Sequence, residues 1–116
     1  MMNAPAIDSA TFEALKQTTG ADFVVELVDT FLQEAPAMLD ELRRALAAQD
    51  ADKFRRAAHS LKSNSNTFGA LTLGAMAREL ELGGMAKAIE GGGQPLDVLA
   101  QEYSRVAAAL TDLQHE

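Results

Sequence analysis

Residues 58–70 read AHSLKSNSNTFGA and hold His59, one of only two histidines in the chain. Apolar and small residues recur at helical spacing through this stretch and just before it, and at about 100° per residue they fall on one face of a helix. The residues of this face are Phe54, Ala57, Ala58, Leu61, Ser65 and Phe68. His59 lies roughly 150° from the middle of that face. The stretch therefore predicts a helix that buries one side in a core and carries His59 towards solvent or a groove between helices.

A small group of polar residues accompanies His59 on the same helix. Lys62 follows it by three residues and Ser63 by four, so the three side chains lie on one face about a turn apart, and Asn66 extends this face. An imidazole beside an ammonium and a small hydroxyl is suited to hold a phosphoryl group. A lone helical histidine is more commonly an ordinary surface residue, however, and the spacing alone does not decide between the two interpretations.

Helical patterns account for the rest of the chain, and no run of β-branched residues indicates a strand. Capping residues, glycines and prolines divide it into helical segments at about 8–18, 22–49, 50–69, 70–90 and 95–113. Asp22 is the expected cap of the second segment, and Gly83-Gly84 in the fourth either allows a close helix contact or marks a bend. We therefore predict an all-α fold, an antiparallel up-down-up-down four-helix bundle with a short additional N-terminal helix. Its single domain spans residues 8–116 and follows a flexible arm of residues 1–7.

The second segment carries two neighbouring apolar rows, which indicates contact with two other helices. The shorter of these rows is Val25, Leu32 and Leu39. Packing is the simpler explanation for the first two residues, whereas Leu39 stays open as a docking residue.

The composition argues against several classes of protein. The net charge of −7 argues against nucleic-acid binding, and no apolar run approaches the length of a membrane span. The chain lacks cysteine and has only His59 and His115 as imidazoles, so we expect no disulfide, no metal site and no cofactor. The N-terminus lacks the basic and apolar regions of a signal peptide, which suits a cytoplasmic protein. We expect a monomer, because one complete bundle already has its own core.

The residues His59-Ser60-Leu61-Lys62-Ser63, followed by Phe68-Gly69, resemble the motif of the histidine-containing phosphotransfer (HPt) domain. That motif is H-x-[LI]-[KR]-G, a few small residues, and then a hydrophobic residue and glycine. Residues 19–42, TGADFVVELVDTFLQEAPAMLDEL, look like the first and second helices of the family, including its Phe-Leu-x-x-Ala-Pro segment, so the resemblance covers nearly the whole chain. Ser63 stands where the family has glycine, and because serine is nearly as small, we expect partner docking to survive this departure.

The resemblance implies a histidine phosphocarrier of a multistep two-component phosphorelay, without ATP-dependent kinase activity of its own. His59 would accept a phosphoryl group from one receiver-domain aspartate and pass it to another, and Lys62 would help neutralise the phosphate. Glu81, 22 residues after His59, matches the Gln or Glu that orients the imidazole in many family members, and Glu79 is a weaker candidate. The expected partners are receiver domains of hybrid sensor histidine kinases and response regulators, which would supply the aspartate and Mg²⁺. We expect them to dock on a surface that includes Ser63, Asn66, Arg55 and Leu39.

Two other interpretations compete with this one. The dimerisation domain of a sensor histidine kinase also carries a helical phosphohistidine, but it usually places an acidic residue directly after the histidine, where this chain has Ser60. The other is a non-catalytic helical adaptor that binds receivers without being phosphorylated. The presence of both His59 and Lys62 argues against the adaptor without excluding it.

Overall fold

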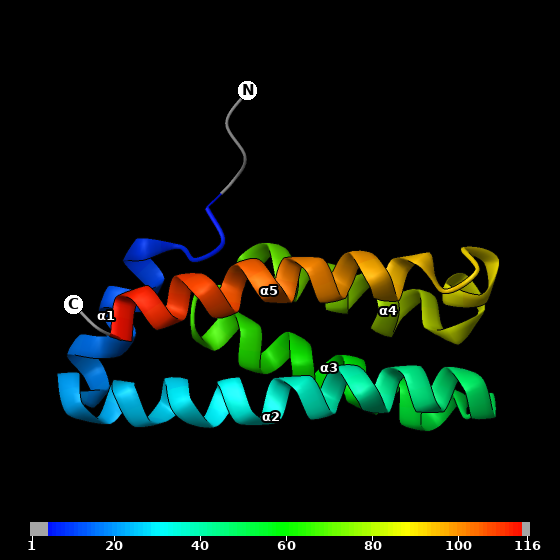
Figure 1. The fold of residues 1–116 in the computed structure, drawn as a ribbon, viewed down its shortest axis with the longest axis horizontal. Coiled ribbons are helices and arrows are strands. Elements are labelled where there is room, and N and C mark those ends of the chain that lie inside the picture. Colours follow the sequence, from blue (N-terminus) through cyan, green and yellow to red (C-terminus); the bar gives the residue numbers. More distant parts are fainter. Residues whose placement is uncertain (1–4, 115–116) are drawn as a thin grey trace.

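The computed structural model describes residues 5–114, and all the regular structure in this part of the chain is helical. The helices are α1 (Ser9–Thr19), α2 (Ala21–Ala48), α3 (Ala51–Thr67), α4 (Leu71–Glu90) and α5 (Gln94–Gln114). Figure 1 shows the last four running back and forth along the long axis, with α1 across one end. The predicted fold class, an up-down-up-down bundle with a short additional N-terminal helix, is confirmed.

The helix ends follow from local chemistry, with one correction. The Asp8 carboxylate accepts a hydrogen bond from the backbone N–H of Thr11 at 3.1 Å and caps α1, and Asp50 caps α3 in the same way through Lys53 at 3.1 Å. The prediction that Asp22 caps the second helix is wrong. The N-cap is Gly20, with no side-chain hydrogen bond, and Asp22 lies inside the first turn, where its charge still suits the positive end of the helix dipole.

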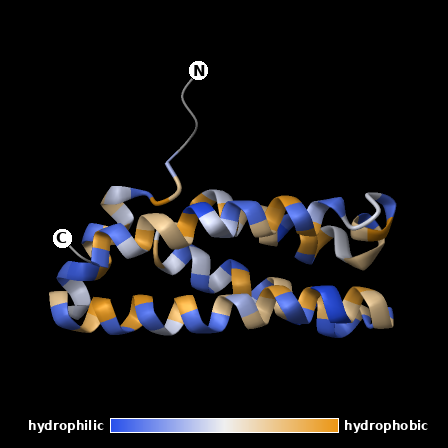
Figure 2. Ribbon diagram, in the orientation of Figure 1, coloured by the Kyte–Doolittle hydropathy of each residue, from blue (hydrophilic) through white to orange (hydrophobic). Residues whose placement is uncertain are grey.

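The core lies between the inner faces of the four long helices. Figure 2 shows apolar and polar residues alternating along each helix, as the helical periodicity requires. The face predicted for α3 is buried along its whole length. Phe31 of α2 packs on it, because its ring centroid lies 5.1 Å from that of Phe68. This face fixes how α3 is rotated, and therefore which way His59 points.

The turn between α3 and α4 also anchors the N-terminal segment. Asp8 donates its backbone N–H to the carbonyl oxygen of Gly69 at 2.7 Å. Gly69 adopts a φ of +84°, and a Cβ there would lie 2.8 Å from the carbonyl oxygen of Asp8, so the turn requires glycine. Ile7 is only 6% exposed and belongs to the core, which corrects the assignment of this residue to a flexible arm. Residues 1–4 of that arm lie outside the described residues.

Helix α4 bends at Gly84, whose φ of 70° and ψ of −172° are not helical. No atom outside its neighbours lies within 4 Å of the position that a Cβ would take there, so this glycine does not serve a close helix contact. Of the two interpretations of the Gly83-Gly84 pair, the bend is therefore the one that the structure supports. Within the described residues, no helix is long and apolar enough to cross a membrane.

Candidate functional site

His59 lies on the outer side of α3, with 56% of its side chain exposed. The prediction that it faces away from the core is confirmed. Leu61, two residues later, is completely buried. The burial of the apolar face of α3 therefore keeps His59 on the exposed side of the helix.

Glu81 of α4 brings the site together from the opposite helix. Its Oε2 lies 2.7 Å from Nδ1 of His59, and its Oε1 lies 2.7 Å from Nζ of Lys62. The carboxylate therefore bridges two residues of α3 that stand one turn apart. Its side chain is only 14% exposed, so this bridge is shielded from solvent much better than the imidazole itself. Glu79, the weaker candidate, is exposed on α4.

The bridge fixes the protonation pattern of the imidazole. The Lys62 ammonium holds the pKa of the Glu81 carboxyl below its usual value, and the His59 hydrogen bond adds to this effect, against an opposing contribution from desolvation. Glu81 is therefore a carboxylate at neutral pH and can only accept hydrogen bonds. Nδ1 of His59 must then carry the proton, which in a neutral imidazole leaves the lone pair on Nε2.

The four predicted docking residues have different surroundings. Ser63 and Asn66 are exposed on α3, and a Cβ on Gly74 of α4 would collide with the Asn66 side chain, so the two helices are closely packed there. Arg55 is exposed and pairs with Asp52 at 2.9 Å. Leu39 is partly buried and packs against the core, so it presents only part of its side chain.

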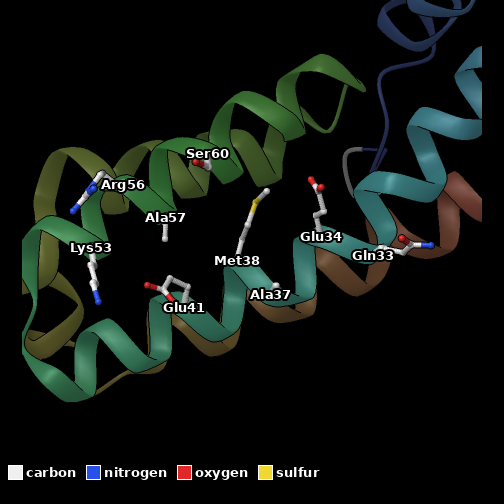
Figure 3. Close-up of a pocket in the computed structure, with 9 residues that line it drawn as sticks. All are labelled: Gln33, Glu34, Ala37, Met38, Glu41, Lys53, Arg56, Ala57 and Ser60. Carbon is white, nitrogen blue, oxygen red and sulfur yellow. The ribbon is translucent and has the colours of Figure 1, made fainter.

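An open groove of about 580 Å³ runs between α2 and α3 beside this site. Figure 3 shows Glu34, Met38 and Glu41 on the α2 side of the groove, facing α3. Its complete lining is Gln33, Glu34, Ala37, Met38, Glu41, Lys53, Arg56, Ala57 and Ser60. Its lining includes Ser60, which directly follows His59 in the chain and lies about 100° further around α3. The amino-acid sequence does not predict this groove, because a groove depends on how far apart two helices stand.

The charge of α3 is opposite to that of the whole chain. The helix carries four basic side chains, Lys53, Arg55, Arg56 and Lys62, and one acidic side chain, Asp52, which gives it a net charge of +3 in a chain of −7. The helix that presents His59 therefore favours an anionic partner. Within residues 5–114, no group of three or more His, Asp or Glu side chains is arranged to hold a metal ion.

Comparison with known proteins gives consistent results. The family model described as Hpt domain matches residues 26–115. Over 79 residues, 68% of this chain, the sequence is 33% identical to the sensor protein TorS of Escherichia coli (strain K12), and the match spans only 9% of the length of that relative. The crystal structure of histidine-containing phosphotransfer protein B (HptB) from Pseudomonas aeruginosa PAO1 superposes with a TM-score of 0.88, at 26% identity and with 97% of both chains covered. The chain thus belongs to the Hpt domain family, and this membership supports a phosphotransfer function in two-component signalling.

Proposed function

We propose that this chain is a phosphocarrier whose His59 relays a phosphoryl group between receiver-domain aspartates. The observation that carries the proposal is the hydrogen bond between His59 Nδ1 and Glu81, which in the neutral imidazole leaves the lone pair on Nε2. Nε2 attacks the phosphorus of an aspartyl phosphate, the P–O bond to the aspartate breaks as the N–P bond forms, and the donor carboxylate is released. A second receiver aspartate then reverses the same step.

The residues around His59 have separate roles in this step. Glu81 keeps the imidazole oriented and stabilises the positive charge that its ring gains when Nε2 bonds to phosphorus. Lys62 helps to neutralise the phosphoryl oxygens as they approach. Phosphoryl transfer depends mainly on such positioning and charge stabilisation, and the Mg²⁺ that it needs belongs to the receiver.

The face of α3 and the groove beside it form the docking surface in this proposal. Ser63, Asn66 and Arg55 are its exposed residues on α3, and Leu39 contributes the part of its side chain that is not packed in the core. The net positive charge of α3 fits the anionic aspartyl phosphate site of a receiver. The partners are the receiver domains of hybrid sensor histidine kinases and response regulators, and the chain binds them as a monomer with no cofactor of its own.

Transfer from a phosphorylated receiver tests the proposal. The wild-type chain should gain an acid-labile label that maps to His59 by mass spectrometry and is removed by a second receiver. The His59→Gln variant should gain none, and His115→Gln should behave as wild type, because it keeps the phosphoacceptor. Binding without label across a broad panel of receivers would instead identify a non-catalytic adaptor.

A further inference from the structure

One cation beside the site, Arg78, pairs with no carboxylate of residues 5–114. The chain has six arginines, and five of them pair with carboxylates: Arg43, Arg44, Arg55, Arg56 and Arg105. Arg78 is exposed and, within residues 5–114, has no carboxylate oxygen within 4 Å. An arginine of α4 is therefore available to bind an anion from outside the chain.

The packing of α4 on α3 places Arg78 at the site. Gly74 lies against Asn66, and Glu81 contacts His59 and Lys62. Arg78 comes four residues after Gly74 and three before Glu81, so it shares their face of α4 and stands about one turn from each. It is therefore located along the α3–α4 seam between the two contacts, close to the level of Lys62.

Glu81 explains why Arg78 has no partner. A residue three positions further along a helix is a natural partner for an arginine, but both oxygens of Glu81 are taken by His59 and Lys62. Glu79 is the next residue in the chain and does not face the same way. The bridge that orients the imidazole thus also leaves the guanidinium uncompensated.

We propose that Arg78 binds the phosphoryl oxygens on Nε2 of phosphorylated His59. A phosphoryl group brings nearly two negative charges, whereas Lys62 is already offset by Glu81. Arg78 supplies the further positive charge, and its planar guanidinium can hold two oxygens at once. This proposal rests on the proposed function only in taking His59 as the phosphorylated residue.

The test needs no receiver domain. Phosphoramidate phosphorylates histidine directly: its N–P bond breaks, a new N–P bond forms at the imidazole, and ammonia leaves. Loading the full chain with His115→Gln in place confines the label to His59. The pH titration of the phosphoryl ³¹P chemical shift then reports the charges around it. Arg78→Ala should raise the midpoint of this titration by about half a pH unit or more, because a nearby cation favours the dianion.

Two further variants sharpen the result. Arg78→Lys should bring the midpoint of the titration most of the way back to the wild-type value, because lysine again places a positive charge at this position. Lys87→Ala should leave the midpoint unchanged, because Lys87 is an exposed cation of α4 beyond the bend at Gly84. An unchanged midpoint in Arg78→Ala overturns the proposal. If transfer from a receiver is then slowed, Arg78 binds the receiver instead. Because the titration uses a chemical donor, it remains readable even if no receiver phosphorylates the chain.

Discussion

His59 and Leu61 are two residues apart on α3, and their substitutions should have opposite consequences. Leu61 is 0% exposed, and replacing such a leucine by alanine costs about 3 kcal/mol, from lost burial and from the cavity left behind. For a domain of this length, that corresponds to a fall in Tm of roughly 12 °C. His59→Gln should change the free energy of unfolding by less than about 0.5 kcal/mol, because the side chain is 56% exposed and the glutamine amide can still donate to Glu81.

The two variants should also separate stability from transfer. Urea denaturation followed by circular dichroism gives the free energy of unfolding, and transfer from a phosphorylated receiver gives the activity. Leu61→Ala should keep transfer at temperatures well below its lowered Tm, whereas His59→Gln should lose transfer with its stability intact. If His59→Gln lost nearly as much stability as Leu61→Ala, the assignment of His59 as an exposed functional residue would be wrong, because the imidazole would then contribute to the stability of the fold.

The remaining predictions concern the bridge, the turn and the charge of α3. Glu81→Gln should slow transfer by about 10- to 100-fold, because Nδ1 of His59 loses the carboxylate that fixes its proton. The rates of phosphoryl transfer to wild type and to Glu81→Gln from a set of receivers measure this effect. The pKa of Glu81 is lowered in the folded state, chiefly by Lys62. The stabilising contribution of this carboxylate is therefore present above the normal carboxyl pKa and is lost as the pH falls through the lowered value. Between pH 6 and pH 3, urea denaturation should show a larger loss in the free energy of unfolding for wild type than for Glu81→Gln. Gly69→Ala should lower the free energy of unfolding by about 1–3 kcal/mol, measured by urea denaturation, because of its positive φ and the nearby Asp8 carbonyl. Receiver binding should weaken as salt rises from about 0.01 to 0.15 M, and Arg55→Ala should reduce this dependence while Arg44→Ala on α2 should not.

Much of the fold was predictable because helical periodicity records which side of each helix is buried. The rotation of α3, and with it the exposure of His59, follows from the apolar face alone. Glu81 lies about 80° around α4 from the buried Leu73, at the edge of the apolar face, where its side chain can reach a neighbouring helix. The preference for Glu81 over Glu79, however, came from the family spacing of 22 residues between the histidine and the acidic residue. Helical periodicity does not give this preference, because only the register between α3 and α4 decides which carboxylate contacts the imidazole.

The errors arose where the decisive contacts are tertiary. Ile7 belongs to no periodic pattern, and it is buried next to the hydrogen bond between Asp8 and Gly69, which joins segments 61 residues apart in the chain. Glycine and aspartate are both acceptable N-cap residues, and in the structure Gly20 is the N-cap of α2. The unpaired state of Arg78 could not be predicted either, because it follows from Glu81 turning both oxygens towards α3.

The distribution of charge explains how an acidic chain can select an anionic partner. With +3 on α3 and −7 in total, the rest of the molecule carries −10, so an anionic partner is repelled by most of the surface and attracted at the helix of His59. Attraction confined to one helix orients the encounter as well as strengthening it. Phosphorylation of His59 adds nearly two negative charges to this helix and lowers its net charge to about +1. In the proposed relay, the charges that guide the receiver to His59 would therefore be largely offset once the phosphoryl group has arrived, and the attraction to the receiver that delivered it would weaken.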